Sequence, residues 1–411
     1  MSGPLSGLRV LELSRILAGP WAGQLLADYG AEVIKIERPG TGDDTRSWGP
    51  PFLTDEAGRE TSESAYFLST NRGKRSVAID IARPEGQALV RRLALNSDVL
   101  IENFKVGGLK KYGLDYASLA ADHPSLVYCS ITGFGQDGPY AEHAGYDAAI
   151  QAMGGLMSIT GGADNLPGGG PQKVGVAVAD LMCGLYAVTA IQAALLHRQT
   201  SGRGQHIDLS LLDTQVAWLA NQASNYLIGG QVPGRQGTGH PNIVPYQVFA
   251  TANGHVMLAV GNDAQFTRFA SIADRPEWAE QPDFATNRAR VENRERLLPL
   301  IEAVMRQRDT DDWVAACRSA GVPASPINNL ERVFADPQVQ HRRMVRHIKH
   351  PLKDQLPSVA NPVRFSATPV DYVQPPPLLG ADTQAVLTER LGLDEAEITG
   401  LARLGVIDIA S

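Results

Sequence analysis

Short apolar runs alternate with amphipathic stretches along the first 150 residues of the chain. The apolar runs are rich in β-branched and aliphatic residues and predict strands at 8–13, 31–37, 76–80, 98–103 and 126–131. Between strands, 18–30 and 84–97 have helical spacing and end at Gly or Ser. This alternation predicts an α/β fold built from βαβ units around a mostly parallel sheet. Ligands of such sheets bind where strands end, so the residues after each strand are the first candidates for a site.

A long apolar segment, VGVAVADLMCGLYAVTAIQAALLHR at 174–198, contains a single acid, Asp180. Its first six residues read as a strand, and Asp180 is expected to open a helix. The segment is about as long as the roughly 20 residues that a bilayer requires. It also contains Gln192 and many small residues, which favours a buried helix over a membrane span. We therefore expect no membrane association.

The 411-residue length predicts two domains, because single cores rarely grow to this size. A Gly- and Pro-rich stretch is followed by a hairpin signal at Asn253-Gly254 and then by helices to about residue 320. We predict a large domain over 1–200, a linker at 201–227, a smaller α+β domain over 228–325, and a return to the large domain over 326–411.

Charge and cysteine usage narrow the class of protein. The formal net charge is −7 and no long Lys or Arg block is present, so nucleic acid is not an expected partner. The cysteines Cys129, Cys183 and Cys317 stand alone, which suits a reducing, cytoplasmic location. Neither they nor the nine histidines show metal-ligand spacing, so no metal site is predicted. The motifs GxxxxGK[ST], GxSxG and HExxH are missing, which disfavours nucleotide hydrolysis, serine esterase chemistry and zinc proteolysis.

Basic residues cluster in and next to three successive predicted strands. They are Lys35, Arg38 and Arg46, then Arg72, Lys74, Arg75 and Arg83, then Lys105, Lys110 and Lys111. Strand ends of one sheet lie close together, and guanidinium and ammonium groups bind phosphate with charge-assisted hydrogen bonds. The pattern predicts a phosphorylated ligand despite the acidic total charge.

A series of segments carries a family resemblance. In chain order they are AGPWAGQLLADYGAEVIKIERPGTGDDTR, NRGKRSVAIDI, ENFKVGGLKKYGLDY, SITGFGQDGPY, GYDAAIQAMGGLMSITG, VAVADLMCGLYA and SGRGQHIDLSLLD. Together they resemble, nearly end to end, the class III CoA transferases of the formyl-CoA and carnitine type. The resemblance implies a Rossmann-like large domain, coenzyme A or acyl-CoA as substrate with no permanently bound cofactor, a free carboxylic acid as second substrate, and a homodimer of interlocked rings.

Site residues follow from this resemblance where the segments match. Asp180 takes the place of the family's nucleophile, in front of a Gly-containing apolar helix. The positions expected to contact CoA are Leu17, Ala18, Arg38, Ile79, Asp80, Ile81, Ala82, Asn103, Phe104, Lys105, Lys111, Gly145, Tyr146 and Asp147. Formyl-CoA transferases carry Gln where this chain has Leu17, which argues against formate or oxalate as substrate.

The loop GRQGTGHPNIVPYQVF, beginning at Gly234, resembles the family members that use dicarboxylic acids, such as the succinate–hydroxymethylglutarate type. This similarity implies succinyl-CoA as donor, with Gly237, Gly239 and His240 in a substrate loop. His240, like Arg235, either helps to hold the acceptor carboxylate or is a turn residue. Glycine lets a backbone approach a ligand closely, so this loop and the segment 154–162 are the expected sources of N–H donors for an oxyanion.

Two acids keep alternative interpretations. An Asp before a helix is commonly an N-cap, and Asp180 fits that role as well as catalysis. As a catalyst it is expected to be kept ionised by the helix N-terminus. Asp147 in GYDAAI is either a second functional acid or a residue that starts a helix.

Two other functions compete with CoA transfer. The α-methylacyl-CoA racemases share the family fold and use a His in a GHD motif, but here the motif reads Gly145-Tyr146-Asp147. Tyrosine, with a usual pKa of about 10, is a poor base near neutrality. A CoA-binding protein without turnover is the second alternative, and fold alone does not exclude it.

Overall fold

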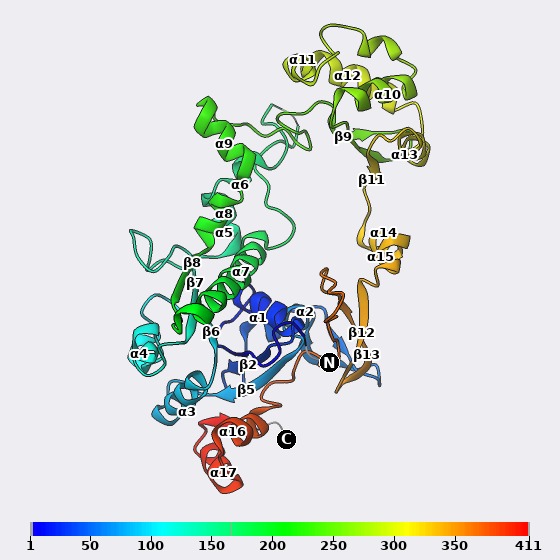
Figure 1. Cartoon of the computed structure of the whole chain (residues 1–411). Coiled ribbons are helices and arrows are strands. Elements are labelled where there is room, and N and C mark those ends of the chain that lie inside the picture. Colours follow the sequence, from blue (N-terminus) through cyan, green and yellow to red (C-terminus); the bar gives the residue numbers. More distant parts are fainter. Residues whose placement is uncertain (1–2, 166, 410–411) are drawn as a thin grey trace. The chain divides into compact units, whose positions relative to one another are not determined.

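The computed structural model describes residues 3–165 and 167–409 (Figure 1). The chain forms two compact units. The first contains the residues up to 155, 175–223 and those from 338 onward, and the second contains 156–174 and 224–337. The Gly-rich segment 156–174 therefore belongs to the second unit and not, as the sequence suggested, to the large domain.

The first unit is built on a mostly parallel sheet. Within the described residues its order is β14-β5-β2-β1-β6-β7-β8, and only β14 runs antiparallel to its neighbour. The strands are β1 (Arg9–Glu12), β2 (Glu32–Glu37), β5 (Lys74–Ile79), β6 (Val99–Glu102), β7 (Val127–Thr132), β8 (His206–Ser210) and β14 (Ile407–Asp408). The five strands predicted from apolar runs are confirmed. The predicted linker over 201–227 is wrong, because it contains β8 at the edge of this sheet.

The strand order reverses direction at β1. Chain order runs outward from β1 through β2 and β5 on one side, and through β6, β7 and β8 on the other. In open parallel sheets the crevice at such a switch point, outside the carboxyl ends of the strands, is where ligands bind. Here the switch point lies between the loop after β1 and the loop after β6.

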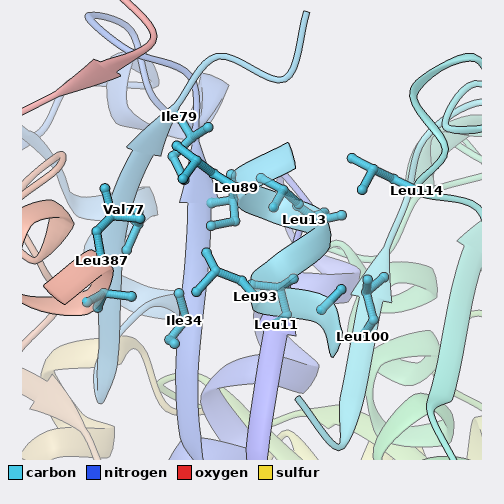
Figure 2. Packing of buried hydrophobic residues seen from close by; sticks show 14 of the residues in the cluster. Leu11, Leu13, Ile34, Val77, Ile79, Leu89, Leu93, Leu100, Leu114 and Leu387 are labelled. Carbon is cyan, nitrogen blue, oxygen red and sulfur yellow. The ribbon is translucent and has the colours of Figure 1, made fainter. Parts of the chain in front are cut away.

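Alternate strand residues point to opposite faces of the sheet, and each face is covered by its own helices. Leu11, Ile34, Val77 and Leu100 form one buried cluster with Leu89 and Leu93 of α3 (Figure 2). The other face is covered by α1 and α7. The main helices of this unit are α1 (Ala18–Asp28), α2 (Ala65–Thr70), α3 (Pro84–Leu95), α4 (Tyr116–Ala120), α5 (Asp147–Met153), α7 (Val178–Ser201), α8 (Leu211–Ala217), α16 (Thr383–Leu391) and α17 (Glu395–Arg403).

Smaller elements complete this unit. They are the 3-10 helices η1 (Asp44–Ser47) and η2 (Lys110–Tyr112) and two hairpins, β3 (Phe52–Thr54) with β4 (Glu60–Ser64) and β12 (Val345–His350) with β13 (Lys353–Val359). The helices α9 (Ala220–Gly229) and α15 (Pro337–His341) each contain residues of both units.

The second unit has an antiparallel sheet in the order β11-β10-β9, and the hairpin predicted at Asn253-Gly254 connects its β9 and β10. Its core contains Phe249, Phe266 and Trp313, all at most 1% exposed. Its elements are β9 (Tyr246–Ala250), β10 (His255–Ala259), β11 (Ala324–Pro326), α6 (Leu156–Ile159), α10 (Asp263–Ile272), η3 (Pro276–Ala279), α11 (Asn287–Glu292), α12 (Arg294–Met305), α13 (Thr310–Ser319) and α14 (Leu330–Ala335).

The start of α7 corrects the sequence prediction. The run before Asp180 is not a strand: the helix begins at Val178, and its N-cap is Ala177, whose side chain makes no capping hydrogen bond. Asp180 is therefore the third residue of the helix and not its N-cap. Within the described residues α7 is also the helix that is long and apolar enough to cross a membrane. Half of its most apolar 18-residue stretch is buried inside this chain.

Candidate active site

A pocket of about 600 Å³ lies at the carboxyl ends of the first unit's strands and contains Asp180. Close packing of two helices contributes to this position. A side chain at Gly184 would place its Cβ 2.7 Å from the carbonyl oxygen of Ala18, so glycine there lets α7 lie against the start of α1. The pocket is lined by most of the residues that the sequence placed around CoA, namely Leu17, Ala18, Asn103, Phe104, Lys105, Lys111, Gly145, Tyr146 and Asp147.

A second pocket of about 850 Å³ is lined by the remaining predicted CoA residues, Arg38, Ile79, Asp80, Ile81 and Ala82. The two pockets share lining residues at Arg15, Asp44, Phe104 and Tyr112. The structure thus brings every residue of the predicted CoA set to one of two adjoining hollows at the switch point of the sheet.

The expected convergence of ten basic side chains is only partly correct. Arg38, Lys105, Lys110 and Lys111 are exposed and form no ion pair within residues 3–165 and 167–409, so their charges are available to an anion. The other six are paired with carboxylates, as Lys35 with Glu12 and Asp43, Lys74 with Glu12, Arg46 with Glu37 and Glu63, Arg72 with Asp28, Arg75 with Glu32, Asp382 and Glu389, and Arg83 with Asp80.

Several of these pairs are buried, and Lys35, Glu37 and Asp43 among them line the second pocket. Lys35 and Lys74 are at most 1% exposed, and both donate to the equally buried carboxylate of Glu12. Arg46 makes two hydrogen bonds of 2.8 Å to Glu37 and lies over the ring of Phe67. A charge that is buried and fully paired in this way supports the fold and is not free to hold a ligand.

The carboxyl of Asp180 is mostly buried. Its burial, followed by repulsion from the nearby Asp147, raises its pKa to about 7. Burial therefore opposes the ionisation that the helix N-terminus was expected to favour.

Asp147 begins α5 and also acts on the start of α7. Its Oδ1 accepts a hydrogen bond of 2.9 Å from the backbone N–H of Ala179, and its Oδ2 accepts one of 2.8 Å from the side-chain amide of the buried Gln151. Because Ala177 cannot cap α7, Asp147 supplies the missing acceptor from another helix. Asp147 thus starts a helix and also lies near Asp180, while its role as a second functional acid stays a prediction.

Sequence analysis missed two aromatic residues close to Asp180. Tyr66 of α2 has its pKa raised to about 12 by burial and by the charges of Asp180, Asp147 and Asp43. Trp48, whose ring meets that of Tyr66 edge to face at 5.2 Å, lines the Asp180 pocket. Trp48 stands out only as an aromatic residue in the Gly- and Pro-rich stretch SWGPPF, and nothing in the spacing of Trp48 or Tyr66 points to the nucleophile.

The predicted substrate loop belongs to the second unit, whereas Asp180 belongs to the first. Its backbone N–H groups already have acceptors, since Gly237 donates to the carbonyl of Gly161 and Gly239 to that of Gln236. The His240 ring packs on Tyr246, and burial lowers the pKa of His240. The two Gly-rich segments therefore lie together, but these two N–H groups are not free to bind an oxyanion. The role of the loop stays a prediction.

No group of three or more His, Cys, Asp or Glu side chains suited to a metal ion occurs among the described residues. The chemistry available at this site is that of a half-ionised carboxyl group beside a hollow edged by free cations. A carboxylate that is poorly solvated and open to a pocket is suited to attack an activated acyl group.

These features are those of an α/β protein in which a carboxyl group lies on the wall of a pocket lined by lysines unpaired within the described residues. The model of CoA-transferase family III matches residues 5–383, and this chain belongs to that family. It is 53% identical over 386 residues to the succinate–glutarate CoA-transferase of Agrobacterium fabrum, a match that covers 94% of this chain and 95% of that one. It is 44% identical to the human succinyl-CoA:glutarate CoA-transferase, with 98% and 90% covered.

A solved structure, that of a CAIB/BAIF family protein from Brucella suis, has the same architecture. Its TM-score with this chain is 0.83, the two are 50% identical, and the match covers 95% of this chain and all of the other. The mostly parallel α/β fold of this chain therefore matches that of an experimentally determined structure.

Proposed function

We propose that this protein moves coenzyme A from succinyl-CoA to a free dicarboxylic acid such as glutarate, with Asp180 as the nucleophile. The names of its relatives from Agrobacterium fabrum and human support both substrates. The observation that carries the proposal is the position of Asp180, a buried carboxyl group on the wall of a pocket lined by free lysines. A protein that only bound CoA would gain nothing from an acid whose ionisation is opposed in this way.

The reaction proceeds by acyl exchange through Asp180. A carboxylate oxygen of Asp180 attacks the thioester carbon of succinyl-CoA, the C–S bond breaks, and the products are a mixed anhydride and CoA thiolate. The thiolate then attacks the Asp180 carbonyl carbon of the anhydride, and succinate leaves. Asp180 now holds CoA as a thioester. Glutarate repeats the two steps in reverse order, which forms glutaryl-CoA and restores the carboxylate.

Each attack places negative charge on a carbonyl oxygen, and the start of α1 is the best placed donor. The helix begins at Ala18 on the pocket wall, and its N-cap, Leu17, makes no side-chain capping bond. The first N–H groups of a helix have no partner within it and favour an anion. We assign this end of α1, in place of Gly237 and Gly239, as the oxyanion-binding element.

CoA occupies both pockets in this proposal. The thioester lies beside Asp180, and the nucleotide end extends into the second pocket, where Arg38 is available for a phosphate. Lys105 and Lys111, which line the first pocket, offer further charge. An extended ligand of this kind needs adjoining hollows, and the shared wall at Phe104 provides them.

We expect dicarboxylic acids to be the preferred acceptors. With succinyl-CoA as donor, glutarate should give a kcat/KM at least about tenfold higher than pentanoate, the monocarboxylate of equal length, because one charged hydrogen bond is worth roughly 1.5–3 kcal/mol. Products are identified by mass after incubation of the purified protein with a panel of acids. Equal rates with glutarate and pentanoate would refute a dicarboxylate site.

We also propose that the protein is a homodimer. The large apolar side chains Leu185, Tyr186 and Leu196 of α7 and Val216 of α8 are exposed, as is Trp218 just after α8. A monomeric soluble protein rarely leaves so much apolar surface on neighbouring helices open to water. Light scattering should give twice the mass of the 44.1 kDa chain, and Leu196→Glu should lower it toward the single chain. A wild-type protein that scatters as a monomer would refute the proposal.

We place the enzyme in the cytoplasm. Its cysteines, Cys129, Cys183 and Cys317, are all buried as free thiols, which suits a reducing compartment.

A further inference from the structure

The loop that joins β1 to α1 lies at the switch point of the sheet and touches both pockets. Arg15 lines both of them, Ser14 lines the second, and Ile16, Leu17 and Ala18 line the one that contains Asp180. This loop therefore runs beneath the whole proposed path of CoA. Its shape determines where the start of α1 meets the thioester.

Three consecutive residues of this loop are held by side chains from elsewhere. The carbonyl of Ser14 accepts a hydrogen bond of 2.8 Å from Nζ of Lys35 on β2. The backbone of Arg15 is held twice by Asn103, which follows β6: its Oδ1 accepts from the N–H at 2.9 Å, and its Nδ2 donates to the carbonyl at 2.7 Å.

The next residue, Ile16, is held by a carboxylate. Its backbone N–H points between the two oxygens of Asp43 and lies 3.2 Å from each. Asp43 also bonds the backbone N–H and the hydroxyl of Thr45 and forms an ion pair of 3.0 Å with Lys35. The carboxylate that accepts from Ile16 is thus held in place by contacts with residues outside the loop.

Ile16 has an unfavourable backbone conformation. Its φ is +73°, in the left-handed region. A β-branched residue is a clear outlier there, because its side chain crowds its own backbone. Such a conformation persists only where the surroundings enforce it, and it concentrates at functional sites.

The enforcing groups are themselves rigid and buried. The side chains of Lys35 and Asp43 are at most 1% exposed, and Glu12 completes the set with an ion pair of 3.0 Å to Lys35. Lys35, one of the charges that the sequence suggested for phosphate binding, is therefore used to shape this loop. Asn103, predicted to contact CoA, has its side-chain amide engaged with Arg15.

We propose that Lys35, Asp43 and Asn103 are positioning residues that hold Ile16 in the left-handed conformation and so set the start of α1 against the reacting thioester. The inference about turnover rests on the proposed CoA-transferase function. The inference about strain at Ile16 does not. A misplacement of about 1 Å at a reacting centre can lower the rate by a large factor. A small change in the conformation of this loop is therefore expected to slow turnover.

Two substitutions of Ile16 isolate the strain. Ile16→Ala and Ile16→Gly both remove the side chain, but only glycine adopts a positive φ without cost. We expect the melting temperature of Ile16→Gly to be higher than that of Ile16→Ala by about 2 °C or more, the reverse of the usual order of these residues. If the Ala variant is as stable as the Gly variant, or more stable, the inference that the backbone at residue 16 is strained is refuted.

Removal of each holding group tests the positioning role. Asp43→Ala and Asn103→Ala are made in three backgrounds: wild type, Ile16→Ala and Ile16→Gly. In the first two, we expect kcat/KM for succinyl-CoA to fall about tenfold, because the loop relaxes to a negative φ. In the Gly background, where the left-handed form needs no support, we expect a loss below about threefold. Asn103 is half-buried, so its variant should fold even if Asp43→Ala does not.

The two sets of outcomes are separable. Equal losses in all three backgrounds overturn the positioning role, because a merely structural contribution of Asp43 or Asn103 does not depend on the residue at position 16. A wild-type protein that moves no CoA from succinyl-CoA to any acid refutes the proposed function instead, and the comparison of melting temperatures still stands.

Discussion

Replacement of Asp180 by Asn stops CoA transfer. We expect the rate with succinyl-CoA and glutarate to fall by roughly 10⁴-fold or more, because a carboxamide cannot form the anhydride and the covalent route is lost. Asp180→Ala should lose as much. The effect is measured as the rate at which glutaryl-CoA forms from succinyl-CoA and glutarate, with the product identified by its mass.

Stability provides the control for this variant. Folding raises the pKa of Asp180 from 3.8 to about 7, so the unfolded chain gives up this proton more readily than the folded protein. The free energy of unfolding therefore falls as the pH rises from about 4 to about 7 and stays lower above pH 7. Asp180→Asn removes that cost. It should unfold at a higher temperature than wild type at pH 8, and the difference should vanish below about pH 4. A variant that still turns over at the wild-type rate would contradict the nucleophilic role.

The pH dependence of the free enzyme follows from the same carboxyl group. We expect kcat/KM for succinyl-CoA to fall about tenfold per pH unit below a midpoint near 7, since only the ionised Asp180 attacks. Asp147→Asn should move this midpoint to lower pH. It removes the neighbouring charge, yet the amide oxygen can still accept from the N–H of Ala179.

The expected shift of the midpoint is specific to Asp147, as the groups near Asp180 show. They are Asp147 on α5, the phenol of Tyr66 on α2, and the thiol of Cys183 one turn along α7, and of these only Asp147 raises the pKa of Asp180 by its charge. Asp213→Asn, at an exposed acid in the first turn of α8, is the matched control and should leave the midpoint in place. If the Asp147→Asn profile coincides with that of wild type, Asp147 does not tune the nucleophile.

Local pattern was enough to predict the five strands β1, β2, β5, β6 and β7 of the main sheet, because they are buried on both faces and read as continuous apolar runs. The edge strands β8 and β14 are partly exposed and lack such runs. The same rule failed before Asp180. VGVAVA has the composition of a buried strand, but its last two residues form the first turn of α7. Periodicity does not separate a short buried strand from the start of a buried helix.

Other errors came from contacts between distant parts of the chain. The segment 156–174 lies in the second unit partly through the bond between Gly161 and Gly237, which no local signal encodes. Lys35 and Arg46 resembled phosphate ligands because the sequence does not show which carboxylates they pair with, and their partners Glu12 and Glu63 lie on other strands. The raised pKa of Asp180 was missed for the same reason, since burial depends on the whole fold.

If Asp180 carries CoA as a thioester, mass spectrometry of the enzyme during turnover should detect the adduct. With succinyl-CoA and no acceptor acid, we predict a CoA adduct on the peptide containing Asp180, absent from Asp180→Asn and lost when glutarate is added. Hydroxylamine should convert the same residue to a hydroxamate. An enzyme that turns over while its CoA adduct lies on another residue, or never forms, would contradict the account.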